Sequence, residues 1–143
     1  MVTMKVRWSI YVLVCCVLLC LTGCGSNKEV QRSVLRVGVV LYTQDDPFIN
    51  ALTDCLKEDL EDYETDSLKI IMTVRDGKND QKLQDEVVEE ILDAGCDILV
   101  VDLVDRTEPS SIIKMAKNEN IPVIFFNREP VREDLMQWDK LYY

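Results

Sequence analysis

Apolar residues in this chain fall into two kinds of run, which alternate along the sequence from residue 34 onward. Short runs rich in β-branched residues predict buried strands, and stretches with apolar residues every three or four positions predict amphipathic helices. The predicted strands cover residues 34–41, 68–74, 98–103 and 121–126, and a fifth begins at 141. The predicted helices cover residues 47–63, 80–94 and 109–118, and residues 135–141 form a helix or a loop.

The ends of the predicted helices carry residues that start or stop a helix. Asp46 before Pro47 is a strong start signal, because an aspartate cap accepts free amide hydrogens and proline fits the first turn. Asn79 and Asp80 open the second helix, and Gly95 closes it as a C-terminal cap. Strands that alternate with helices predict an α/β fold, a doubly wound parallel sheet with helices on both faces. The nearly continuous apolar strands agree, since parallel strands are buried on both sides.

The N-terminus has the pattern of an export signal. Lys5 and Arg7 precede the apolar stretch Trp8–Leu21, whose 14 residues are too few for a membrane-spanning helix, which needs roughly 20. The stretch ends in Leu21-Thr22-Gly23-Cys24, which resembles the processing signal of bacterial lipoproteins. Cleavage there would leave Cys24 as the lipidated first residue. An uncleaved anchor and an ordinary secretory signal are the alternatives.

This interpretation divides the chain into three parts. Residues 1–23 are a lipoprotein signal peptide, residues 24–33 are a flexible polar tether, and residues 34–143 are one folded domain. It also predicts a location outside the cytoplasm, at a membrane surface, because lipid chains tether a protein without spanning the bilayer.

Charge and cysteine content exclude several partners. The formal net charge of −10 argues against a nucleic acid, which needs clustered Lys and Arg. Cys55 and Cys96 lie in the predicted domain, and both are expected to be small buried hydrophobes, with a disulfide between them as the less favoured alternative. The chain has no histidine and no cysteine pair at ligand spacing, so the sequence predicts no metal site.

Polar and aromatic side chains gather just beyond two of the predicted strands. Tyr42, Asp46 and Phe48 follow the first strand, and Asn127 follows the fourth. Ligands of α/β sheets bind beyond the carboxyl ends of the strands, so these four side chains are expected to share one rim. Two aromatic rings with a carboxylate and an amide suit a polyhydroxylated ring such as a sugar.

Five stretches carry a resemblance that runs from about Val34 to the last residue. They are Val37–Phe48, Asn79-Asp80-Gln81, Val101-Asp102-Leu103-Val104-Asp105, Val123–Pro130 and Asp139–Tyr143. In this order and spacing they resemble the sugar-binding proteins of bacterial ABC transporters, and among these the ones for galactose and glucose. The resemblance implies a type I periplasmic binding fold, with two α/β lobes that close on the sugar. It also implies a hexose as ligand and an ABC permease as partner.

The resemblance also implies a role for each rim residue. Phe48 would stack against one face of the pyranose, whose C–H bonds meet the negative face of the ring. Asp46 would accept charge-assisted hydrogen bonds from sugar hydroxyls. Asn127 can donate and accept at once, and Tyr42 would line the pocket beside them.

The resemblance covers only the first of the family's two lobes. The second lobe, with the family's calcium loop, and the segment that returns to complete the first lobe match nothing in residues 34–143. We therefore expect an incomplete N-terminal lobe, a fragment without a cofactor of its own. Because half of the contacts are missing, we expect weak or unmeasurable sugar binding by this chain alone.

Three other functions compete with sugar transport as interpretations of this sequence. A phosphoacceptor receiver domain would bind magnesium through Asp45, Asp46 and either Asp102 or Asp105, but the export signal and the position of Asn127 argue against it. Otherwise Asp102 and Asp105 are expected only to shape a loop. Chemoreception, in which the sugar-loaded lipoprotein meets a membrane receptor, stays open. An enzyme is not expected, since the chain offers no histidine, no activated nucleophile and no glycine-rich phosphate loop.

Overall fold

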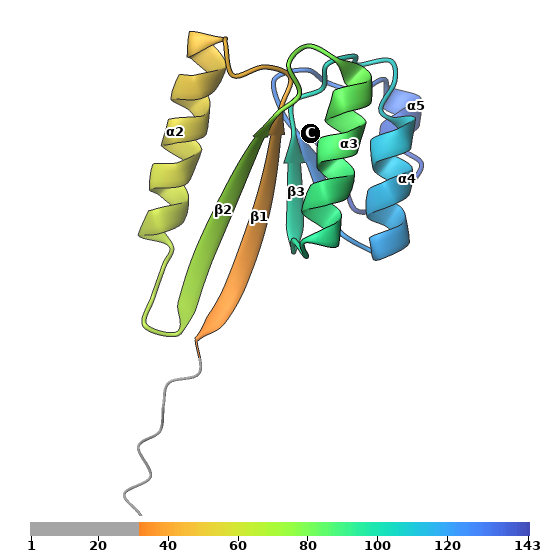
Figure 1. Ribbon diagram of the computed structural model, residues 1–143. Coiled ribbons are helices and arrows are strands. Elements are labelled where there is room, and N and C mark those ends of the chain that lie inside the picture. Colours follow the sequence, from red (N-terminus) through yellow and green to blue (C-terminus); the bar gives the residue numbers. More distant parts are fainter. Residues whose placement is uncertain (1–31) are drawn as a thin grey trace, which may run out of the picture. The chain divides into compact units, whose positions relative to one another are not determined.

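The structure, a computed structural model, describes residues 32–143. The expected signal peptide, most of the expected tether and Cys24 lie outside the described residues. The elements in chain order are β1 (Ser33–Leu41), α2 (Pro47–Asp62), β2 (Leu68–Asp76), α3 (Gln81–Asp93), β3 (Ile98–Val101), α4 (Ser110–Glu119), β4 (Val123–Phe125), α5 (Arg132–Leu135) and β5 (Leu141–Tyr142), as Figure 1 shows. None of the helices in this part of the chain is long and apolar enough to cross a membrane.

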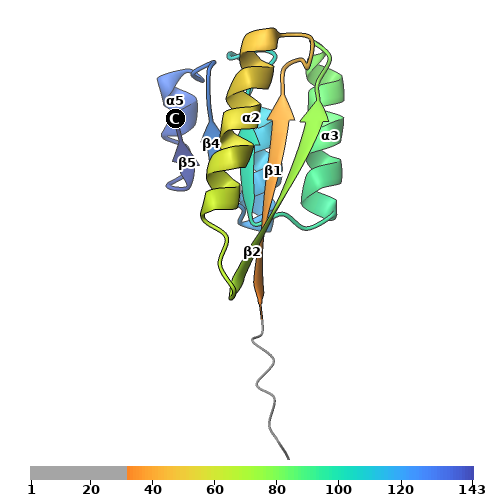
Figure 2. The ribbon, with the colours of Figure 1, turned by 90° about the vertical axis from the view of Figure 1, so that its left-hand side faces the viewer.

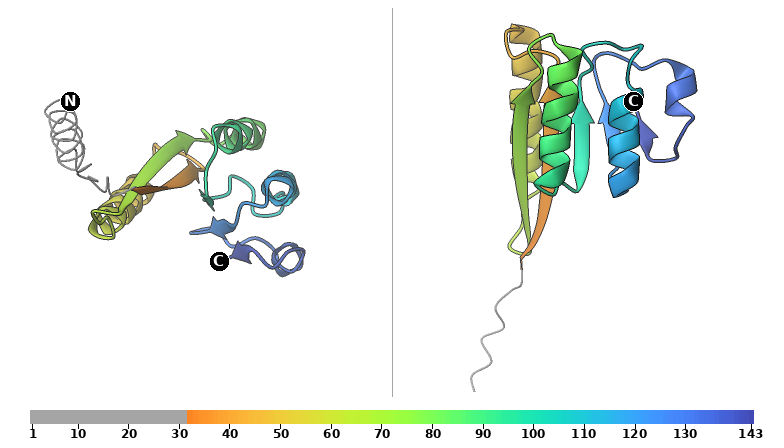
Figure 3. Two further views of the ribbon diagram at one scale, coloured as in Figure 1. Left: turned by 90° about the horizontal axis from the view of Figure 1, so that it is seen from below. Right: turned by 45° about the vertical axis from the view of Figure 1, so that its right-hand side comes forward.

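All five strands join one parallel sheet in the order β2-β1-β3-β4-β5. The chain first moves outward from β1 to β2, then crosses back to β3 and continues in the opposite direction. Crossovers between parallel strands are almost always right-handed, so this reversal is expected to place α2 on one face and the later helices on the other. Figures 2 and 3 show this arrangement, with α2 on one face of the sheet and α3, α4 and α5 on the other. The predicted doubly wound α/β sheet is therefore confirmed.

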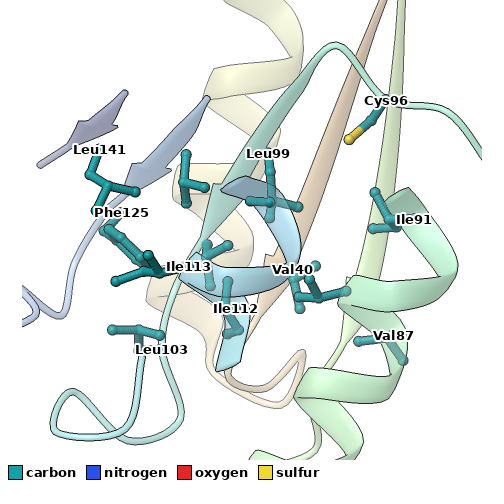
Figure 4. Packing of buried hydrophobic residues seen from close by; sticks show 14 residues of the cluster. Val40, Val87, Ile91, Cys96, Leu99, Leu103, Ile112, Ile113, Phe125 and Leu141 are labelled. Atoms are coloured by element: carbon teal, nitrogen blue, oxygen red, sulfur yellow. The ribbon is translucent and has the colours of Figure 1, made fainter. Parts of the chain in front are cut away.

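Strand β1 lies at the centre of the core, and every residue from Val37 to Leu41 is buried. Successive side chains of a strand point to opposite faces of the sheet. Val40 therefore joins the cluster beneath α3 and α4, where Ile112 is fully buried (Figure 4). Val39 joins the cluster on the other face, against Ile49 of α2.

Helix α2 begins where the sequence predicts, but only part of its predicted apolar stripe packs against the sheet. The sequence pattern predicts an apolar stripe made of Phe48, Leu52, Cys55, Leu56 and Leu60. Leu56 and Leu60 pack against the cluster on that face of the sheet, but the other three are exposed. Ile49 and Thr53 face the sheet instead. Thr53 tolerates burial because its hydroxyl donates to the Ile49 carbonyl at 2.8 Å, which satisfies the polar group.

The two cysteines of the described chain have different environments. Cys55 is exposed on α2, so the expectation of a buried residue is wrong there, whereas Cys96 is buried in the cluster beneath α3 (Figure 4). Both are free thiols. Cys55 and Leu52 instead border an apolar groove between α2 and the sheet, whose floor includes Val100 and Ile124.

Paired alanine substitutions on α2 test which stripe holds the helix to the sheet. We expect Ile49→Ala to lower the free energy of unfolding by about 2–4 kcal/mol, because Ile49 is fully buried. We expect Leu52→Ala to cost less than about 1 kcal/mol, since 40% of that side chain is already exposed. Urea unfolding of both variants measures the difference. Equal losses would show that Leu52 packs as the sequence pattern predicts.

Candidate functional site

The loops that follow β1, β3 and β4 meet at one end of the sheet, the upper end in Figure 1. The first loop carries Tyr42 and leads to Asp46 and Phe48 at the start of α2. The third carries Asn127, directly after β4. All four residues singled out from the sequence therefore lie at the carboxyl ends of β1 and β4, the two strands that flank β3, and α/β sheets bind their ligands at this edge.

Asp46 caps helix α2 and is held by three donors. One carboxylate oxygen accepts from the backbone amides of Phe48 at 2.8 Å and Ile49 at 3.5 Å, and the other accepts from the Tyr42 hydroxyl at 2.5 Å. The Tyr42 hydroxyl and then the Phe48 amide lower the pKa of Asp46, so this carboxylate stays ionised at neutral pH. The same bond, together with burial, raises the pKa of Tyr42.

Phe48 stands in the first turn of α2 with 65% of its surface exposed. Packing against the sheet therefore does not explain an aromatic residue at this position. Phe48 follows the capping residue Asp46 by two positions, and its backbone amide donates to the Asp46 carboxylate. The first turn of α2 thus offers an open aromatic face next to an ionised carboxylate.

Arg128 is a rim residue that the sequence interpretation missed. Its guanidinium lies 3.7 Å from the centre of the Tyr42 ring, a cation–π contact. One of its nitrogens donates to the carbonyls of Leu103 at 3.1 Å and Val104 at 2.8 Å. Arg128 therefore joins the loops after β1, β3 and β4. In the sequence, its position directly after Asn127 is what could have placed Arg128 at the rim.

Asn127 rests on a buried acid. Its backbone has a left-handed φ of 59°, which asparagine tolerates better than most residues. Its side-chain nitrogen donates to both carboxylate oxygens of Asp102, at 3.2 Å and 3.0 Å. Asp102 itself has no exposed surface, and this burial raises its pKa from 3.8 to about 6.

The two acids after β3 have different functions in the structure. Asp105 shapes the loop as expected, because its carboxylate accepts from the amide and the hydroxyl of Thr107 at 2.8 Å and 2.7 Å. Asp102 supports the rim from below. The loop between them is fixed by buried Gln84, which donates to the Asp102 carbonyl at 2.8 Å and accepts from the Val104 amide at 2.9 Å.

A parallel sheet of this order matches part of one lobe of a type I periplasmic binding protein. The family model for the periplasmic binding protein domain matches residues 37–143, and the chain belongs to that family. Within residues 32–143, no group of three or more His, Cys, Asp or Glu side chains is arranged so that it could hold a metal ion.

Known relatives agree with this assignment. The D-galactose/methyl-galactoside binding periplasmic protein of Haemophilus influenzae is 33% identical over 108 residues, which are 76% of this chain and 31% of the relative. The chain thus spans about a third of that relative's length. Relatives of this kind are extracytoplasmic solute-binding proteins, which at the level of the family indicates binding and not catalysis.

Solved structures show the same fold. An ABC transporter solute binding protein from Bacillus halodurans with bound myo-inositol superposes with a TM-score of 0.58 at 27% identity, over 70% of this chain and 33% of that one. A galactofuranose binding protein gives a TM-score of 0.64 at 23% identity, over 75% of this chain and 34% of the other. The bound or named ligands differ between these proteins, although all are polyhydroxylated.

The substitution Asp102→Asn tests what the buried charge costs. Because folding raises the pKa of Asp102, its ionised form destabilises the native state at neutral pH, and the penalty disappears as the pH falls from about 6 towards 3.8. We expect D102N to raise the free energy of unfolding at neutral pH by about 2–3 kcal/mol, and this gain to vanish near pH 4. Urea unfolding at several pH values measures it.

The matched control is Asp105→Asn on the same loop. The Thr107 hydroxyl lowers the pKa of Asp105, so the ionised form is favoured in the folded state and D105N gains no stability at neutral pH. A D102N variant that is less stable than the wild type at neutral pH would contradict the expectation. It would mean that polar contacts fully compensate the buried carboxylate.

Proposed function

We propose that this chain forms the first half of a hexose-binding site in an extracytoplasmic lipoprotein that delivers its sugar to an ABC permease. The observation that carries the proposal is the exposed Phe48 ring beside the ionised Asp46 carboxylate, at the ligand end of a periplasmic binding protein lobe. The galactoside-binding relative supports the galactose and glucose class as the ligand.

Phe48 supplies the apolar part of the proposed site. A pyranose has faces of C–H bonds, which are attracted to the negative face of an aromatic ring. Phe48 stands in a helix whose cap is fixed by Asp46, so its backbone position is set before a ligand arrives. This preorganisation lowers the entropy lost when the sugar binds.

Asp46 and Asn127 supply the polar part. A carboxylate accepts up to four hydrogen bonds, and three donors already hold Asp46, which leaves room for a sugar hydroxyl. Charge-assisted bonds of this kind are roughly twice as strong as neutral ones. Asn127 lies two strands away, beyond β3, so a ring placed over the sheet end is reached from both sides.

The proposed half-site predicts low affinity for the 143-residue chain. Phe48 and Asn127 are exposed, so a sugar on this rim keeps much of its surface in water. A dissociation constant of about 1 mM corresponds to only about −4 kcal/mol, which a few such contacts can supply. Micromolar binding by this chain would contradict the half-site, because it would require contacts on the second face of the sugar.

Replacing Phe48 tests the stacking contact. Titration with D-glucose or D-galactose, followed by NMR, is expected to shift the signals of Tyr42, Phe48 and Asn127 at millimolar concentrations. We expect Phe48→Ala to weaken this binding about 2- to 10-fold with little loss of stability, because the ring is exposed. Tyr63→Ala is the matched control, since Tyr63 is 71% exposed at the other end of α2. Shifts that F48A leaves unchanged would overturn the proposed site.

Cys24 tests the proposed location. Cys24 ends the N-terminal apolar stretch in the lipoprotein-like sequence Leu21-Thr22-Gly23-Cys24. Metabolic labelling in a bacterial host with a fatty-acid analogue is expected to label the wild-type chain and to leave Cys24→Ala unlabelled and poorly retained at the membrane. Cys20→Ala, a change within the apolar stretch, should keep its label. Labelling that survives C24A would contradict the proposed anchor.

A further inference from the structure

Asp102 is an acid at a fully buried position, where an ionised side chain destabilises the folded state. It has no exposed surface, and among the residues that the structure describes, its carboxylate bonds only to the amide nitrogen of Asn127. The nearest cation, Arg128, lowers the pKa of Asp102 but gives its hydrogen bonds to main-chain carbonyls. A buried carboxylate without a bonded cation costs free energy that an apolar residue would not. A function at the rim would explain why this position holds an acid.

That function follows from the chemistry of the Asp102–Asn127 pair. An ionised carboxylate only accepts hydrogen bonds, whereas an asparagine amide has a donating end and an accepting end of almost equal size. Two carboxylate oxygens within 3.2 Å therefore fix which end of Asn127 turns downward. The nitrogen faces Asp102, and the carbonyl oxygen is directed away from it. With a neutral side chain at position 102, either orientation of the amide would be allowed.

We propose that Asp102 is a positioning residue that fixes the amide of Asn127, so that the rim presents hydrogen-bond acceptors to the sugar. The acceptors are the Asp46 carboxylate and the Asn127 carbonyl oxygen. This half of the site then binds sugar hydroxyls as donors. The inference rests on the proposed sugar-binding function, and it refines the expectation from the sequence that Asn127 can donate and accept at once.

Protonation of Asp102 removes this constraint. A neutral carboxyl group can donate to the Asn127 carbonyl oxygen, so the amide is free to turn its nitrogen outward. Burial raises the pKa of Asp102 to about 6. The other charged or titratable groups that act on it are Asp46 and Tyr42 after β1 and Arg128 after β4. The pKa of Asp46 is lowered and that of Tyr42 is raised, so Asp102 is the member of this group that titrates in mildly acidic solution.

The experiment follows the Asn127 side-chain amide by NMR in the full chain, kept in solution with a mild detergent, from about pH 7.5 to about pH 4.5. We expect the two amide hydrogen signals to shift with the same midpoint, near pH 6, as the Asp102 carboxyl carbon. In Asp102→Asn the signals should stay constant over this range. In the control Asp105→Asn they should titrate as in the wild type, because the Asp105 carboxylate contacts Thr107 instead.

Sugar titrations at both ends of the pH range complete the test. For the wild type and D105N we expect binding about fivefold weaker at the acidic end, the value of one neutral hydrogen bond. For D102N we expect no such pH dependence. If wild-type sugar binding does not change with pH while the Asn127 amide signals titrate, the orientation of this amide does not affect the affinity for the sugar, and that part of the proposal is wrong.

The NMR titration of Asn127 tests the positioning role, and the sugar titrations test the proposed function, so failure of one can be told from failure of the other. Asn127 signals that ignore the titration of Asp102 would overturn the positioning role, whether or not sugar binds. Signals that follow Asp102 without any response of the rim to either sugar would leave the positioning role intact and count against the proposed function. The wild-type titration alone decides the positioning role if D102N fails to fold.

Discussion

The parallel pairing of β1 with β2 on one side and β3 on the other is the constraint on which the rest of the structure depends. It buries Val37–Leu41 on both faces, so a single strand contributes to both hydrophobic clusters. Parallel register also brings the carboxyl ends of β1, β3 and β4 to one edge. Residues that are far apart in the chain, such as Asp46 and Asn127, become neighbours of one rim for this reason alone.

Polar contacts between the loops after β1, β3 and β4 hold the rim residues in place. Arg128 joins three loops, and Tyr42 connects that junction to the helix cap at Asp46. Asp102 is the member of the network that burial disfavours, as its raised pKa shows. A destabilising charge beneath the most exposed polar rim residue is typical of a site where stability is given up for ligand geometry.

The sequence predicted the sheet well because its signals were redundant. Strand β1 is marked by β-branched residues, and α2 is marked by Asp46 and Pro47 together. The buried stripe of α2 was harder to predict, since two adjacent stripes both repeat with helical spacing. A buried Thr53 can be recognised only when its hydroxyl is seen to bond within the helix.

The rim residues could be predicted by position, but their interactions could not. Tyr42, Asp46, Phe48 and Asn127 all follow strands, which the hydrophobic pattern locates. The hydrophobic pattern does not show that Asp102 is buried under Asn127. It predicts a strand that continues to residue 103, whereas β3 ends at Val101 and Asp102 lies just beyond it. Pairing across the sheet is a long-range property that no local pattern encodes.

The capping bond of Asp46 also decides which charged molecules can approach α2. A helix N-terminus carries partial positive charge and free amide hydrogens, and for this reason it attracts phosphate groups. Here the amides of Phe48 and Ile49 already bind the chain's own carboxylate, and Asp102 adds a second acid behind the rim. A phosphorylated sugar or a uronic acid would therefore be repelled where a bare helix end would hold it. In the proposed site, this capping would favour neutral sugars over their anionic derivatives at the start of α2.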